Sequence, residues 1–163
     1  MRVSIKLLVL LASIAVSSCA GYAPSRTSIG QDRATLLASM GQPERIQAVN
    51  GMDVLHYPRG PSGSQTYFVY IDDNGRVAKW EQVLTEDRFD TIRPGMTNEQ
   101  VIGILGITKI THGLARNRGY VWHYRYETPH CKSFVIEFTP DDTVRSAGYR
   151  IRSGRFCKYV GMG

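Results

Sequence analysis

Two adjacent pairs of aspartates, Asp72-Asp73 and Asp141-Asp142, have the residue types and spacing that acid–base chemistry could use. Paired carboxylates can serve as acid and base when their surroundings separate their pKa values. Each pair, however, lies where an apolar run ends and a turn sequence begins. Aspartate is frequent in turns because its side chain bonds to the nearby backbone, so turn formation is the preferred interpretation of both pairs.

Sequence motifs for nucleophilic or metal chemistry are missing. The chain contains no G-x-S-x-G and no H-E-x-x-H motif. His130 adjoins Cys131, but no C-x-x-C or H-x-x-x-H spacing supports a zinc site. His56 and His123 occupy matching strand positions; a shared pH sensor is one alternative, and two surface histidines are the favoured one. We therefore predict that the protein is not an enzyme and needs no cofactor, metal or small-molecule substrate.

The first 18 residues have the composition of an export signal. Two cations lead into an apolar run of about twelve residues, whereas a membrane-spanning helix needs roughly 20. The stretch from Val16 to Cys19 resembles the processing signal of bacterial lipoproteins. That resemblance implies removal of residues 1–18 and acylation of Cys19. Because Ala20 rather than Asp follows, it also implies sorting to the outer membrane, facing the periplasm. An ordinary export signal is the alternative.

Export places the two other cysteines, Cys131 and Cys157, in an oxidising compartment, where an even pair predicts a disulfide. Closing this loop is worth roughly 3.5 kcal/mol in the chain-entropy model. Residues 19–28 are rich in small and polar side chains and predict a tether to the membrane.

Charge excludes one class of partner. The processed chain keeps 18 Lys and Arg against 14 Asp and Glu, a net charge of +4, which is too small to suggest nucleic acid. Cations alternate with aromatic residues near the C-terminus, which suits lipid headgroups, although a solvated strand face is favoured. The candidate headgroup residues are Arg150, Arg152, Arg155 and Lys158.

Two stretches of the chain are similar to each other. A shift of 65 residues moves Gly30 onto Gly95, and a shift of 67 moves the VLHY at Val54 onto the VWHY at Val121. Such a series predicts a duplicated unit, with modules at residues 29–88 and 89–163.

Each module reads as one helix followed by three strands. Asp32 and Thr97 are candidate N-caps, the second in a capping box, and Gly41 and Gly106 are candidate C-caps. The strands alternate apolar and polar residues, and a bulge is expected near Ser146-Ala147-Gly148. We predict an α+β fold in which a helix, or a short helix pair, packs on a three-stranded antiparallel sheet. Residues 44–50 and 108–118 stay open between a second short helix and a loop. Modules this small should pack against each other.

The stretch from Ile92 to Gly106, followed by VWHY and FVIEF, resembles the SmpA/OmlA family of BamE-like outer-membrane lipoproteins. That resemblance implies a lipid-anchored periplasmic binding module that supports β-barrel assembly, with outer-membrane assembly proteins or another envelope protein as partners. It makes Arg93, Gly95, Met96 and Thr97 the candidate partner-binding residues. A tandem arrangement also resembles secreted inhibitors of β-lactamase. The alternatives are therefore an inhibitor-like module that binds a periplasmic or secreted enzyme, and a lipid- or cell-wall-binding lipoprotein.

Overall fold

The computed structural model describes residues 23–60, 63–128 and 132–151. It shows two halves. In each half, helical structure is followed by an antiparallel sheet of four strands that are paired in chain order. The first half contains α1 (Arg33–Met40), β1 (Arg45–Val49), β2 (Met52–Arg59), β3 (Gln65–Ile71) and β4 (Val77–Gln82), after a short turn, η2 (Arg26–Ser28). The second half contains α2 (Glu86–Phe89), α3 (Asn98–Leu105), β5 (Thr111–Gly113), β6 (Tyr120–Arg125), β7 (Lys132–Phe138) and β8 (Val144–Ile151), with a turn, η4 (Ala115–Asn117).

Both main helices begin and end as predicted. The side chain of Asp32 accepts the N–H of Thr35 at 2.9 Å, and Thr97 forms a capping box with Gln100. The C-cap glycines have φ of 76° at Gly41 and 78° at Gly106, but their ψ is extended rather than left-handed helical. Positive φ without a Cβ penalty is what the glycines supply here.

The residues just before α1 and α3 form backbone hydrogen bonds with the first residue of the last strand of the same half, β4 and β8 respectively. In the second half the N–H of Gly95 donates to Val144 O at 2.8 Å, and the N–H of Val144 donates to Met96 O at 2.7 Å. The first half repeats this pattern with Gly30, Val77 and Gln31 at 2.8 and 2.9 Å.

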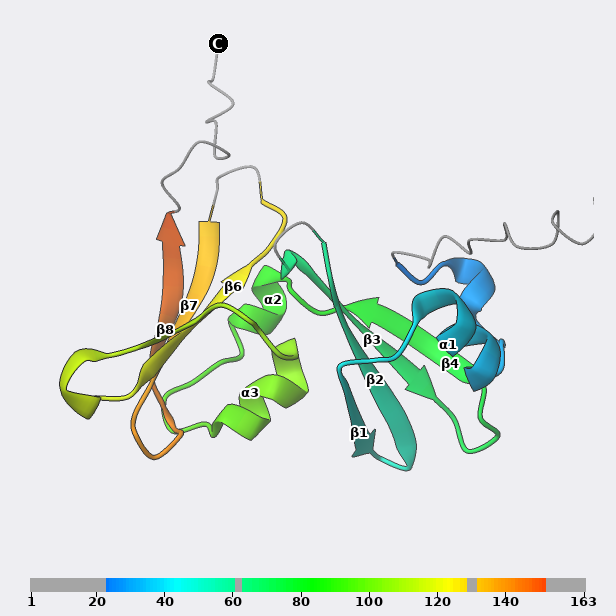
Figure 1. Cartoon of the computed structure of the whole chain (residues 1–163), viewed down its shortest axis with the longest axis horizontal. Coiled ribbons are helices and arrows are strands. Elements are labelled where there is room, and N and C mark those ends of the chain that lie inside the picture. Colours follow the sequence, from blue (N-terminus) through cyan, green and yellow to red (C-terminus); the bar gives the residue numbers. More distant parts are fainter. Residues whose placement is uncertain (1–22, 61–62, 129–131, 152–163) are drawn as a thin grey trace, which may run out of the picture.

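The elements stack in alternating layers (Figure 1). Helix α1 packs on one face of the first sheet, where Leu36 and Met40 meet the buried side chains of β2 and β3. Helices α2 and α3 lie between the two sheets. Val54 and Phe68 from the first sheet join Leu105, Phe138 and other residues of the second half in one core cluster. The two halves therefore share a core, as expected of units that are small on their own.

The prediction of three-stranded sheets is wrong, because each sheet has a fourth strand at its edge. The missed strands are β1 and β5, in the two stretches left open between helix and loop. In β1 the usual polarity is reversed: Ile46 is 48% exposed, while Arg45 and Gln47 face the second half. Strands are predicted from apolar residues at alternate positions on the buried face, and a strand whose buried face is polar lacks this signal.

The bulge expected near Ser146-Ala147-Gly148 is present: Arg145, next to Ser146, has no partner between the pairs Glu137↔Ser146 and Phe138↔Val144. Two smaller expectations are corrected. The predicted tether is too long at its inner end, because residues 25–28 form a capped turn that holds the indole of Trp80 through Ser25 O at 3.0 Å. His56 is not a surface residue: it is fully buried between the halves.

Candidate partner-binding site

The candidate partner-binding residues at the start of α3 all have roles within the fold. Gly95 has a φ of 87° and pairs with β8, Met96 packs against the shared core, and Thr97 caps α3. Arg93 is exposed, and its guanidinium donates to Ile92 O at 3.0 Å. Their contact with a partner stays a prediction, for which Arg93 and Thr97 offer exposed side chains.

Most of the other predicted site residues lie outside the described residues. These are the lipidation residue Cys19, the disulfide pair Cys131 and Cys157, and the cations Arg152, Arg155 and Lys158. Arg150 is described: it lies near the end of β8 with its side chain exposed.

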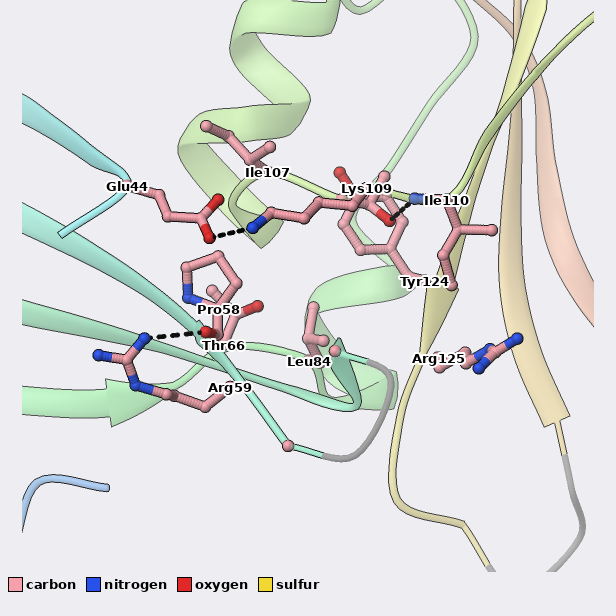
Figure 2. Close-up of a pocket in the computed structure, with 13 residues that line it drawn as sticks. Glu44, Pro58, Arg59, Thr66, Leu84, Ile107, Lys109, Ile110, Tyr124 and Arg125 are labelled. Atoms are coloured by element: carbon pink, nitrogen blue, oxygen red, sulfur yellow. Dashed lines mark hydrogen bonds and ion pairs between the residues drawn. The ribbon is translucent and has the colours of Figure 1, made fainter. Parts of the chain in front are cut away.

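A cleft of about 410 Å³ opens between the two halves. Figure 2 shows the ion pair of Glu44 and Lys109 bridging the halves, with Leu84 and Tyr124 deeper in the cleft. The two charged groups are 2.6 Å apart, and the Lys109 side chain is 76% exposed. The remaining lining residues are Pro58, Arg59, Gly60, Gly63, Thr66, Ile107, Thr108, Ile110 and Arg125.

Two hydroxyl groups in the cleft form hydrogen bonds within the fold. The hydroxyl of Tyr124 donates to Gly106 O at 2.9 Å, and that of Thr108 donates to His123 O at 2.6 Å. Burial raises the pKa of Tyr124, so this hydroxyl stays neutral. The guanidinium groups of Arg59 and Arg125 point outward, away from Leu84 (Figure 2). The cleft therefore combines apolar surface with hydroxyl groups that are bonded within the fold.

Arg88 of α2 is one of several polar links between the halves. Its guanidinium forms an ion pair with Glu81 of β4 at 2.7 Å, donates to Ile104 O at 3.0 Å and lies 6.0 Å from the ring centre of Phe68. Burial alone would raise the pKa of Glu81, but hydrogen bonds from Tyr70 and Arg88 hold it below its usual value. Further bridges join Arg45 to Glu99 at 2.5 Å and Gln65 to Glu127 at 2.8 Å.

Sequence reasoning missed the cleft because its lining comes from both halves. Ile110 falls in the stretch 108–118, whose sequence fits either a short helix or a loop, and Ile107 directly precedes that stretch. No local pattern indicates that these isoleucines face Pro58 and Leu84. The duplication was the only available signal, since two packed units create a junction that neither possesses alone.

The described residues, 23–60, 63–128 and 132–151, hold no group of three or more His, Cys, Asp and Glu side chains that could bind a metal ion. Within the same ranges, no helix has the length and apolar character needed to cross a membrane.

Comparisons with known proteins give one family and two distant structures. Residues 81–148 match the family model described as the outer membrane protein assembly factor BamE domain. No curated protein matches the sequence significantly.

One similar structure is an extracellular protein containing a SCP domain from Bacillus anthracis str. Ames, at 15% identity and a TM-score of 0.33. The match covers 80% of this chain but only 46% of that protein. Another is the DUF4309 family protein YjgB from Bacillus subtilis subsp. subtilis str. 168, at 14% identity and a TM-score of 0.30, covering 81% and 83% of the two chains. At this similarity neither structure assigns a function.

The matched range begins at the end of β4 and contains both helices of the second half, β5, β6, β7 and most of β8. It also contains the Gly95-Met96-Thr97 stretch whose pairing and capping define the start of α3. Residues 81–148 are therefore similar to the domain that the family model describes as the outer membrane protein assembly factor BamE domain.

Proposed function

We propose that this protein is a lipid-anchored periplasmic scaffold of the outer membrane that supports the assembly of β-barrel proteins. The match of residues 81–148 to the BamE domain carries the proposal. The lipoprotein-like signal ending at Cys19 supports the anchor, since two or more acyl chains hold a protein stably on a bilayer. The cleft, which combines apolar surface with bonded hydroxyl groups, is compatible with a binding role.

The first half repeats the architecture of the BamE-like half, and we propose that it is a second, diverged module. The supporting correspondences are in matching places: the glycines Gly30 and Gly95 that bond to the last strand, the C-cap glycines Gly41 and Gly106, and the helix-to-strand order. The cleft exists only because the two halves are joined, so a single module would lack it.

We propose that the cleft receives apolar side chains of the protein partner. Ile107, Ile110 and Leu84 supply the apolar surface, and Tyr124 adds an aromatic ring whose hydroxyl is already bonded. A volume of about 410 Å³ lies in the range of small ligand-sized sites, enough for one or two side chains.

The anchor is tested by Cys19→Ser. The wild-type chain should fractionate with the outer membrane and carry acyl groups by mass spectrometry of its N-terminal peptide. The Cys19→Ser chain should carry none and be released with the soluble periplasmic fraction. Unlipidated wild-type protein would refute the anchor and leave the binding role to the next experiment.

The binding role is tested by crosslinking in cells, followed by mass spectrometry, with variants of the cleft. Ile110→Asp should reduce the recovery of barrel-assembly proteins about tenfold, since a buried charge at an interface is costly. Ile46→Asp is the matched control, because Ile46 is an exposed isoleucine on the β1 edge. A partner set without any barrel-assembly protein would refute the specific machinery.

The remaining site proposals can be checked on the same preparation. Peptide mapping without reduction should recover Cys131 joined to Cys157. Arg93→Glu should weaken partner recovery without changing stability, because Arg93 is exposed. Replacing the C-terminal cations, Arg150, Arg152, Arg155 and Lys158, should reduce binding to anionic vesicles only if they contact headgroups.

A further inference from the structure

The two sheets are covered unequally. The first sheet is covered on both faces, by α1 on one and by α3 on the other, so that four consecutive residues of β2 and four of β3 are buried. The second sheet has helices on one face only. Its opposite face, called here the open face, has no covering element in the described part of the chain.

The open face corresponds position by position to the face of the first sheet that α3 covers. Adding 67 to Val54, His56 and Phe68 gives Val121, His123 and Val135, which lie in the same order across β6 and β7. The internal contact between the halves therefore shows what this kind of face accepts in this fold: a helix laid across it.

A shallow groove of about 460 Å³ runs along the open face. Val121 and Val135 form its apolar part, and Gly148 of β8 leaves room beside them because it has no side chain. These valines are half-buried rather than part of the core cluster. The groove can therefore take a helix that approaches closely, as α3 does on the first sheet.

Close approach in the internal contact depends on glycine. A Cβ on Gly106, at the C-terminal end of α3, would lie 2.7 Å from Thr66 Cγ2 and 3.2 Å from Phe68 Cε1. Gly103, one turn earlier, sits beside the amide of Gln47. A helix that docks in the same way needs small residues along its contact face.

Charge on the open face indicates the polarity of that helix. Arg125, Ser133 and Arg150 form one cross-strand row, so two guanidiniums flank a serine. Among the described residues neither arginine has a carboxylate within ion-pair distance, whereas Glu137 is already bonded to Arg145. Within the described residues, the row is thus a pair of cations without a counter-charge.

The row corresponds to the place where α3 ends on the first sheet. Ser133 is the counterpart of Thr66, and Gly106 at the end of α3 lies over Thr66. At this end of α3, the carbonyl of Ile104 accepts a hydrogen bond from the guanidinium of Arg88 at 3.0 Å. A helix C-terminus carries partial negative charge and is stabilised by cations. Arg125 and Arg150 are therefore placed to receive the C-terminal end of a helix laid in the same direction.

We propose that the open face of the second sheet binds an α-helix of another envelope protein, with small residues along its contact stripe and acidic residues at its C-terminal end. The open face lies on the opposite side of the second sheet from α3. The choice of an envelope protein rests on the proposed function, whereas the binding of a helix holds whether or not the cleft binds its own partner. A second copy of this chain, a lipid and an extended peptide are the competing occupants.

The test is site-specific photocrosslinking of the full-length chain in cells. A photoreactive residue replaces exposed Ser146 on the open face, with exposed Ala38 on α1 as the matched control position. We expect the Ser146 probe to label one helical segment of another protein, identified by mass spectrometry of the joined peptides, with acidic residues at its C-terminal end.

Charge variants make the identification specific. Arg125→Glu with Arg150→Glu should lower the yield of the Ser146 adduct about tenfold. Because Arg125 also lines the cleft, Arg150→Glu alone is the second variant and should lower the yield in the same direction. Arg26→Glu with Arg76→Glu changes the net charge equally on the first half and should leave the yield unchanged. In the partner protein, replacing the acidic residues at the C-terminal end of the labelled helix by lysine should restore its labelling by the Ser146 probe in the Arg125→Glu, Arg150→Glu variant.

Four outcomes would overturn the proposal: an adduct with phospholipid, with a second copy of this chain, or with an extended segment, or no adduct at the Ser146 probe. An adduct yield that does not change with Arg125→Glu and Arg150→Glu would also overturn it, provided that the variant keeps the wild-type unfolding midpoint. Loss of partners through Ile110→Asp, with the Ser146 adduct intact, would separate this surface from the cleft.

Discussion

The imidazole of His56 lies fully buried between the halves, stacked on Phe68 with ring centres 4.0 Å apart. Neither ring nitrogen has a hydrogen-bond partner in the described part of the chain. Burial, reinforced by the nearby charge of Arg45, lowers the pKa of His56 to about 4. The side chain is therefore neutral in the folded protein at any pH above that value.

This burial predicts acid sensitivity. Unfolding restores an ordinary histidine pKa of about 6.5, so between pH 6.5 and pH 4 the unfolded chain binds a proton that the folded chain does not. Stability should be complete above this window and fall by about 2–3 kcal/mol on acidification through it. Denaturant unfolding at pH 7 and pH 4 measures the loss. His56→Leu should remove it, whereas His112→Gln, at an exposed position, should not.

Two equivalent glycines allow a matched comparison. Gly41 and Gly106 have nearly the same φ, but a Cβ on Gly41 would meet nothing within 4 Å. Gly41→Ala should cost about 1–2 kcal/mol through backbone strain alone. Gly106→Ala should cost a further 1–3 kcal/mol, roughly, because the methyl would overlap Thr66 and Phe68. Equal losses in denaturant midpoints would show that the halves do not approach closely.

At the scale of elements, each main helix is tied to its sheet by a tyrosine. The hydroxyl of Tyr57 donates to Gly41 O at 3.1 Å, and that of Tyr124 donates to Gly106 O at 2.9 Å. These bonds satisfy carbonyls that the end of a helix leaves without a partner. The tie fixes where each helix stops over the strands.

Removing either hydroxyl should therefore cost about 1–2 kcal/mol, because it leaves a carbonyl without its donor. Tyr57→Phe and Tyr124→Phe keep the ring packing and should lose similar amounts in thermal or denaturant unfolding. Tyr120→Phe serves as the control, since its hydroxyl contacts Asp142 near the surface. A loss confined to Tyr120→Phe would contradict the assignment.

The helices α1 and α3 and the three longer strands of each half were predictable because their signals are local, whereas the short helix α2 (Glu86–Phe89) was not predicted. Thr97 with Gln100 marks one helix start, and alternation marks Tyr120 to Tyr126, whose inner residues Tyr124 and Tyr126 are buried as expected. Strand β1 was not predictable, because its inward residues Arg45 and Gln47 are polar and meet partners 50 or more positions away in the chain.

The candidate site divides in the same way. The Gly-Met-Thr stretch was visible from sequence, but its pairing with Val144 depends on a strand almost 50 residues later. The cleft and the burial of His56 both arise from packing one half on the other. No sequence pattern within either half predicts that packing. Only the predicted duplication indicated that two units would pack against each other.

At the scale of the whole molecule, Arg88 joins both halves through Glu81, Ile104 and Phe68. Arg88→Met preserves much of the apolar stem but leaves Glu81 without its cation. Because both groups are about a third exposed, we expect a modest loss of roughly 1–2 kcal/mol in the free energy of unfolding. Adding Glu81→Gln should recover part of that loss, and a double-mutant cycle measures the coupling.

A shared core predicts that the two halves unfold together. Val54 and Phe68 of the first sheet belong to the same buried cluster as the aromatic core of the second half. Unfolding of one half would therefore expose apolar side chains of the other half to water.

The chain has two tryptophans, Trp80 on β4 and Trp122 on β6, one in each sheet. Fluorescence of Trp80→Phe therefore reports the second half, and that of Trp122→Phe reports the first. In each variant, the fluorescence transition should coincide in urea with the circular dichroism of the same protein. If the fluorescence of the Trp122→Phe variant changes at a higher or lower urea concentration than its circular dichroism, the two halves unfold as independent domains. The cleft would then lack the rigid walls that a binding site requires.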